Sequence, residues 1–348
     1  MTITIEKFGK IEEQQIDEYT LTNSNQLSLS VINYGGIITK IKMSDRKGKV
    51  EEITVNVNSL AEIAQSRPFH GAIVGPVAGR IADGKYTENG QEIQLEQNEF
   101  NNLLHSGSKG LDNKIWSVEA KEGVEKDSLI LKTILPHQEA GFPGNVEVTV
   151  TYTLNEENEI TIAYEATTDH KTLFNPTNHV YFNLSGNNKE RVDEQLLTVA
   201  SDYYAVLDEE NIPTGELRKV DQSIFDLREG RPLKEVFESK EEQITFREGF
   251  DHPFLLNISK QVPAAQIKHQ ASGRKIEMWT DAPAVVVYTH NHEQLPETKN
   301  EQTIPAHSGL TLETQALPDA VNQKDFGSIW LKPEEKFTSQ TTFKCIIE

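Results

Sequence analysis

Three stretches of the chain place titratable side chains among residues that are typical of strand interiors. A buried carboxylate or imidazole is costly unless it is paired or has a chemical use. Any one of them alone is more typical of a hydrogen-bonded core residue than of a catalyst. Together they supply two imidazoles and a carboxylate, a set suited to general acid and base catalysis. The stretches are 101–107, 175–183 and 309–315, and they contain His105, His179 and Glu313.

Other kinds of chemistry fit the sequence less well. No glycine-rich phosphate loop and no Gly-x-Ser-x-Gly motif is present. His290 and His292 could share one face of a strand, but no third metal ligand lies near them in sequence, so we interpret them as surface or loop residues. Asp251 follows Gly249 and Phe250 at a place suited to a turn, where capping of backbone amides and ligand binding are equally plausible. We therefore expect no cofactor and no metal.

Composition narrows the range of partners and compartments. The formal net charge is −20, which weighs against nucleic acid and anionic membranes as partners. Cys345 is the only cysteine, so no intrachain disulfide can form, as is usual in a reducing compartment. The first seven residues carry no apolar signal core, and no apolar run approaches the length of a membrane span. We expect a cytoplasmic protein, either monomeric or homodimeric.

Strand patterns dominate the chain that must position these groups. Apolar residues alternate along 146–154 and again along 160–166, with a polar turn between them, which predicts an antiparallel hairpin. Residues 284–289 are almost all β-branched or apolar, as in a strand buried on both faces. Only 59–65 and 233–237 favour helices. The absence of a βαβ rhythm predicts an all-β fold, a large antiparallel β-sandwich formed by residues 1–348 as a single domain.

Taken in order, the polar stretches and a series of glycine-containing motifs resemble the aldose 1-epimerase (galactose mutarotase) family. The most specific single match is Thr-Asn-His-Val-Tyr-Phe-Asn-Leu at 177–184. The glycine motifs are weak individually, but their order and spacing extend the resemblance over nearly the whole chain. The matching stretches are 33–36, 45–48, 71–75, 79–82, 104–107, 141–144, 177–184, 212–215, 249–252 and 312–315.

The resemblance implies a galactose mutarotase-like supersandwich that binds a small-molecule sugar and interconverts its α and β anomers without a cofactor. By position, Glu313 matches the family's general base and His179 its general acid. Arg80, His105 and Asp251 match its sugar-binding residues. Ring opening needs a base and an acid in opposite protonation states, so we expect an ionised pair in which each charge stabilises the other.

Two positions depart from the family pattern and leave the substrate open. Gly79 stands where many members have asparagine, and Val286 stands where many have glutamine. A sugar hydroxyl that loses such a partner is penalised by roughly 1–3 kcal/mol, so sugar preference need not be galactose. The alternatives are a carbohydrate-binding protein without activity, an epimerase of an oligosaccharide or a phosphorylated sugar, and an inverting glycosidase that uses Asp251 and Glu313.

Overall fold

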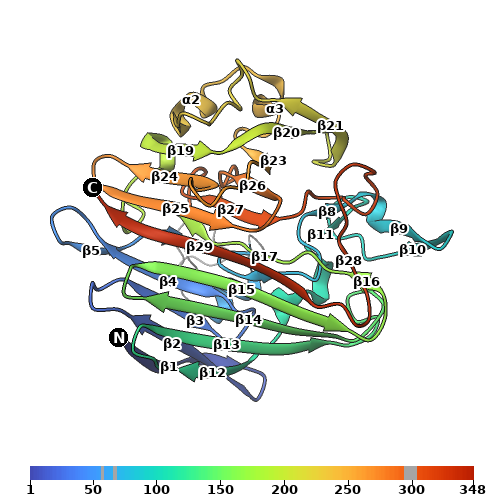
Figure 1. Cartoon of the computed structure of the whole chain (residues 1–348), viewed down its shortest axis with the longest axis horizontal. Coiled ribbons are helices and arrows are strands. Elements are labelled where there is room, and N and C mark those ends of the chain that lie inside the picture. The colour runs from blue at the N-terminus through green and yellow to red at the C-terminus, as the bar shows by residue number, and fades with distance from the viewer. Residues whose placement is uncertain (56–58, 66–68, 294–303) are drawn as a thin grey trace.

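The computed structural model describes residues 1–55, 59–65, 69–293 and 304–348. Its largest sheet has nine strands, which lie side by side across the front of the molecule in Figure 1. Neighbouring strands in this sheet are antiparallel. In spatial order the strands are β12 (Ser117–Lys121), β13 (Lys126–Leu135), β14 (Val146–Asn155), β15 (Glu159–Thr168), β29 (Phe337–Ile347), β25 (Arg274–Thr280), β24 (Ala265–His269), β19 (Gln195–Val199) and β22 (Arg231–Pro232).

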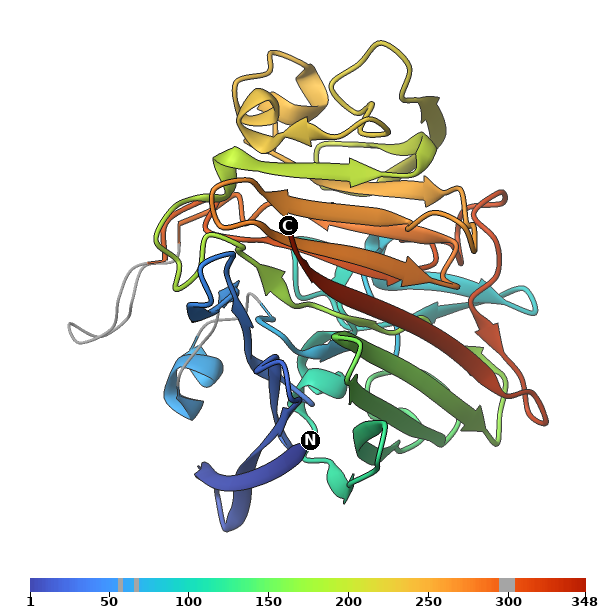
Figure 2. The same cartoon turned by 60° about the vertical axis from the view of Figure 1, so that its left-hand side comes forward.

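Two further antiparallel sheets complete the main framework. The seven-stranded sheet is β21 (Pro213–Lys219), β20 (Ser201–Leu207), β23 (Asp251–Leu256), β26 (Ala284–Tyr288), β27 (Leu310–Gln315), β18 (Tyr181–Phe182) and β6 (Thr54–Val55). The five-stranded sheet, drawn in blue in Figure 2, is β1 (Thr2–Ile11), β2 (Gln14–Thr22), β3 (Ser28–Ile32), β4 (Ile38–Ser44) and β5 (Val50–Glu52).

Shorter elements connect these sheets. Four two-stranded ladders join β7 (Ile73–Val74) to β17 (Thr177–Asn178), β8 (Arg80–Ile81) to β11 (Leu103–Leu104), β9 (Lys85–Glu88) to β10 (Gln91–Gln94), and β16 (Thr172–Leu173) to β28 (Trp330–Leu331). The helices are α1 (Leu60–Gln65), α2 (Leu233–Phe237) and α3 (Glu242–Thr245), and both predicted helices are among them. Among the described residues, no helix is long and apolar enough to cross a membrane.

Alternation along the strands explains how the sheets pack. In the predicted hairpin, Val148 lies opposite Ala166 and Val150 opposite Tyr164, and all four side chains are buried. This inner face of the nine-stranded sheet shares one apolar cluster with the alternate residues of β26 and β27. Phe182 of β18 meets Phe343 of β29 across the interface, with ring centroids 5.1 Å apart. The predicted antiparallel β-sandwich is therefore confirmed.

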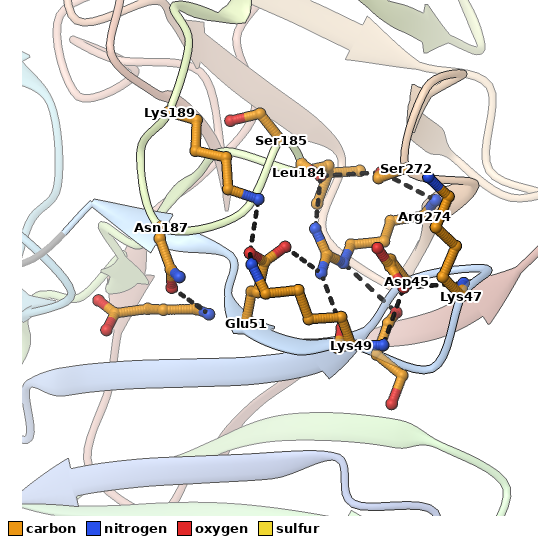
Figure 3. Close-up of polar contacts among 12 residues, drawn as sticks. Asp45, Lys47, Lys49, Glu51, Leu184, Ser185, Asn187, Lys189, Ser272 and Arg274 are labelled. Atoms are coloured by element: carbon orange, nitrogen blue, oxygen red, sulfur yellow. Dashed lines mark hydrogen bonds and ion pairs between the residues drawn. The ribbon is translucent and has the colours of Figure 1, made fainter.

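An ion network centred on a buried carboxylate joins the five-stranded sheet to the nine-stranded sheet, as Figure 3 shows. The Glu51 carboxylate on β5 is 1% exposed and meets Arg274 of β25, whose side chain is fully buried, at 3.0 Å. Lys49 and Lys189 contact the other carboxylate oxygen at 2.6 and 2.5 Å. Arg274 also donates to the Leu184 carbonyl, so the network holds the loop that follows β18.

Candidate active site

Strand register places the predicted carboxylates on one face of the seven-stranded sheet. Residues directly opposite each other on neighbouring strands point to the same side. Asp251 of β23 lies opposite Tyr288 of β26, and Tyr288 lies opposite Thr311 of β27. Glu313 follows Thr311 by two residues and lies opposite Val286. The intervening residues of β26 and β27 turn to the apolar core, so this face is the one available for chemistry.

His179 reaches the same place from the segment that follows β17. Its backbone extends the β7–β17 ladder, because its N–H donates to the Ala72 carbonyl and its carbonyl accepts from the Gly71 N–H, both at 2.9 Å. Asn178 braces this turn by donating to the Gly71 carbonyl at 2.9 Å. Asn183, at the end of the same motif, donates to the Ser308 carbonyl at 2.7 Å. The asparagines of the motif therefore position the backbone on either side of His179.

His179 and Glu313 face each other directly. The His179 Nε2 atom lies 3.3 Å from Glu313 Oε1, and the two side chains are 5% and 4% exposed. The Thr311 hydroxyl donates to the same Oε1 atom at 3.2 Å. Within the described part of the chain Glu313 Oε2 has no hydrogen bond, so this oxygen remains available to a ligand.

Arg80 links the sugar-binding residues that the resemblance implied. It lies on β8, where it pairs with Leu104 of β11, the residue before His105. Its guanidinium binds the Glu99 carboxylate through two nitrogens, the longer contact being 3.0 Å. Its Nη1 atom lies 3.6 Å from Asp251 Oδ2. Arg80 and Asp251 thus form an ion pair near Glu313.

His105 is held in a fixed orientation against His179. The two imidazole rings are perpendicular, with centroids 5.3 Å apart. The Gly79 N–H donates to the ring atom Nδ1 of His105 at 3.2 Å, and the backbone N–H of His105 donates to the Gly79 carbonyl at 3.0 Å. With Nδ1 accepting, the neutral ring carries its hydrogen on Nε2 and acts there as a donor. His105 has a φ of 51°, an uncommon value for a residue other than glycine and one that recurs at functional sites.

Burial governs the protonation of the facing pair. It raises the pKa of Glu313 to about 8, with the nearby Asp251 charge adding to the effect. It lowers the pKa of His179 to about 3. Near neutral pH the pair therefore holds a single proton and carries no net charge, as a carboxylic acid beside a neutral imidazole. The expectation of an ionised pair is wrong for this site without a sugar, because desolvation disfavours the charged form of both groups.

The same residues also resemble a metal-binding set. One ligand atom each from His105, His179 and Glu313 lies within 4.8 Å of the others. A metal-bound histidine normally donates its second ring N–H to a neighbour. The Nδ1 atom of His105 instead accepts from the Gly79 N–H, which leaves its hydrogen on Nε2. This arrangement suits hydrogen-bond donation to a ligand better than metal coordination.

One interpretation from the sequence needs correction. Asp251 does not lie in a turn but begins β23, with its side chain on the site face. His290 and His292 lie after the end of β26 and outside the strands, as predicted; His292 is exposed, whereas His290 is 2% exposed. The His290 ring packs against Tyr181, with centroids 5.4 Å apart. At Asp251 the sheet continues to the site, where a turn residue was predicted.

Sequence reasoning missed three side chains that the fold brings to this site. Thr311 contacts Glu313, and Glu99 holds Arg80. Tyr288 is half-buried between Asp251 and Thr311 in register, and its phenol stays protonated because burial raises its pKa. The two-residue spacing from Glu313 is the signal that could have identified Thr311.

The two departures from the family pattern have clear structural consequences. Gly79 has a φ of +75°, and a β-carbon there would lie 2.9 Å from the Pro318 side chain. The space that a larger residue would need is thus occupied. Val286 sits directly opposite Glu313 on the site face, 6% exposed, so it presents an apolar surface beside the carboxylate.

Comparisons with known proteins agree with this geometry. A family model described as aldose 1-epimerase matches residues 17–344. A galactose mutarotase from Rattus norvegicus is 37% identical over 348 residues, covering 99% of this chain and 98% of that protein. A maltose epimerase from Levilactobacillus brevis is 31% identical, covering 95% of each chain. The crystal structure of galactose 1-epimerase from Lactobacillus acidophilus superposes with a TM-score of 0.89 at 30% identity, covering 99% of each chain.

Proposed function

The chain belongs to the aldose 1-epimerase family, and from this premise we propose how its residues perform the reaction. The protein is an aldose 1-epimerase, an isomerase that acts on small sugars. Glu313 serves as the general base and His179 as the general acid. The observation that carries this assignment is the facing pair, 3.3 Å apart and almost fully buried.

The pair can carry out ring opening with one shared proton. When a closed sugar binds, the proton moves from Glu313 to His179 Nε2. Glu313 then removes the proton of the anomeric hydroxyl while His179 protonates the ring oxygen, the C1–O5 bond breaks and C1 becomes an aldehyde carbon. This step returns the pair to its neutral form, which burial favours.

Rotation about the C1–C2 bond followed by the reverse proton transfers produces the other anomer. Arg80 and Asp251, whose ion pair lies on the same face of the sheet as Glu313, bind sugar hydroxyls. His105 donates its Nε2–H to a sugar oxygen near His179. These contacts hold the rest of the sugar while C1 turns, which is how positioning contributes to rate.

We propose a free aldose such as galactose or glucose as the substrate. A second candidate is the reducing end of a disaccharide, since a maltose epimerase is among the relatives. The only cation in contact with this group of side chains is Arg80, within the described residues, and it is already paired with two carboxylates. That pairing disfavours a phosphorylated sugar.

We also propose that the enzyme works in the cytoplasm as a monomer or homodimer and as a single domain. Its single cysteine, Cys345, is buried, and burial raises the pKa of its thiol to about 12. A thiol of this kind is unreactive and suits a structural role in a reducing compartment.

Polarimetry tests the proposed function. The protein should accelerate the decay of optical rotation of freshly dissolved α-galactose or α-glucose, and maltose distinguishes the second candidate. Glu313→Gln should reduce the rate by about a hundredfold or more, the usual contribution of a positioned base. Glu157→Gln, in an exposed turn, is the matched control and should behave as wild type. If the optical rotation decayed at the same rate with and without the protein, the proposed activity would be wrong and a carbohydrate-binding function would remain.

A further inference from the structure

Thr311 contacts the catalytic carboxylate from a fully buried position. It lies between Tyr181 and Tyr288 in register, on the strands that flank β27. The rings of these tyrosines are 6.1 Å apart and nearly perpendicular. Thr311 itself is 0% exposed. Its hydroxyl is therefore confined, and a buried hydroxyl needs a hydrogen-bond partner.

The partner of this hydroxyl is the carboxylate oxygen that already faces His179. Thr311 donates to Glu313 Oε1 at 3.2 Å, and no other hydrogen bond of its side chain occurs among the described residues. His179 Nε2 lies 3.3 Å from the same oxygen. Among the residues that the structure describes, two groups contact Oε1, and no hydrogen bond or ion pair involves Oε2. The two oxygens of Glu313 have different surroundings.

We propose that Thr311 is a positioning residue for the epimerase reaction: its hydroxyl anchors Oε1 and thereby directs Oε2 of Glu313 at the anomeric hydroxyl. This inference depends on the proposed roles of Glu313 and His179. During ring opening His179 turns its proton toward the ring oxygen and leaves Oε1. Thr311 then remains as the donor to that oxygen, so the carboxylate keeps its orientation and its charge stays solvated.

The same contact tunes the protonation of Glu313. The hydroxyl donates to the charged form of the carboxylate, and this contact lowers the pKa of Glu313 against the larger effect of burial. Removing the donor should raise that pKa further. A residue that served only to fill space would leave the pKa unchanged, since valine has nearly the same shape as threonine.

The test compares Thr311→Val with Thr311→Ser by polarimetry across pH. Loss of a hydrogen bond to a charged group should lower kcat of Thr311→Val by about tenfold to a hundredfold with little change in KM. In a plot of kcat/KM against pH, the fall on the alkaline side (the alkaline limb) should move upward by roughly one pH unit for Thr311→Val, because the pKa of Glu313 is higher without the donor. Thr311→Ser keeps the hydroxyl and should recover most of the rate and the wild-type limb.

Thr314→Val is the matched control on the same strand. Thr314 is buried as well, but its hydroxyl pairs with that of Thr341 at 2.6 Å, on the opposite face of the sheet. This variant should keep the wild-type pH profile even if its thermal unfolding temperature falls. Should Thr311→Val prove unstable, Thr311→Ala against Thr311→Ser gives the same comparison.

The inference is overturned if Thr311→Val stays within twofold of wild type with an unmoved alkaline limb. It is also overturned if Thr311→Ser is as slow as Thr311→Val, or if Thr314→Val shifts the limb equally. These outcomes are distinct from failure of the proposed function. In that case the wild type would be inactive, or Glu313→Gln would be fully active.

Discussion

Glu313→Gln should make the protein more stable while it removes activity. Burial raises the pKa of Glu313 from 4.5 to about 8. At pH 7 the unfolded chain carries an ionised Glu313, whereas the folded chain carries a protonated one, so folding must take up a proton. Glutamine has the shape of the protonated acid and needs no proton. The wild type therefore bears a free-energy penalty that the variant avoids.

The size of this penalty follows from the difference between pH 7 and the unfolded pKa of Glu313, 4.5. At 1.36 kcal/mol per pKa unit it is on the order of 3 kcal/mol at pH 7. The sign depends on pH: below about pH 4.5 both states are protonated and the advantage of glutamine vanishes. The stability advantage of Glu313→Gln grows with rising pH and becomes constant above about pH 8, where Glu313 also ionises in the folded wild type.

Thermal unfolding measured between pH 4.5 and pH 9 tests this reasoning. At pH 7 the midpoint of Glu313→Gln should exceed that of wild type by about 4 °C, from the usual unfolding entropy per residue and the 348 residues of the chain. The two proteins should coincide near pH 4.5. Glu157→Gln, at an exposed position, should show no such trend. The conclusion that Glu313 is a buried neutral acid would be refuted if Glu313→Gln were less stable than wild type at pH 7. It would also be refuted if the difference in unfolding midpoint did not vary with pH.

Three further outcomes are expected. The kcat/KM of wild type should fall above about pH 8, because Glu313 then loses the proton that the pair shares. It should stay constant down to about pH 4, which is above the His179 pKa of about 3. A fall in kcat/KM that begins near pH 6 would contradict these protonation states. Glu51→Gln should lower the free energy of unfolding by about 3–5 kcal/mol in denaturant titration, since Arg274 is left buried without its charge partner. The pKa of Glu51 is lowered to about 2. The difference in free energy of unfolding between wild type and Glu51→Gln should therefore be at its full value above pH 4.5 and disappear as pH falls toward 2. Arg80→Lys should raise KM for the sugar about tenfold or more with a smaller change in kcat, because lysine cannot reproduce the bidentate contact with Glu99; an unchanged KM would remove Arg80 from the binding site.

Some features of the fold and of the site could be predicted from the sequence. Alternation along 146–154 and 160–166 predicted the central hairpin because a half-buried strand requires it. The types and order of His105, His179 and Glu313 predicted an acid and base set, and the structure brings one polar atom of each side chain within 4.8 Å of the others. The roles of individual residues remain proposals that the variants above address.

Other features depended on contacts between distant segments. Asp251 looked like a turn residue because glycine precedes it, yet pairing with Tyr288 makes it the start of a strand. The only sequence signal for Thr311 was its two-residue spacing from Glu313, and its contact with the carboxylate became evident once the register of β27 was known. The partner of Arg80, Glu99, lies 19 residues away on a separate loop. Such pairings arise from tertiary packing and leave no local pattern.

By itself, the sequence determined the class of fold and the chemical groups available, because side-chain periodicity and residue identity are local properties. Tertiary structure alone decided where the proton resides. The ionised pair that charge attraction predicted becomes a neutral pair once His179 and Glu313 are removed from water. Desolvation depends on everything that surrounds a group, and those surroundings come from strands far apart in the chain.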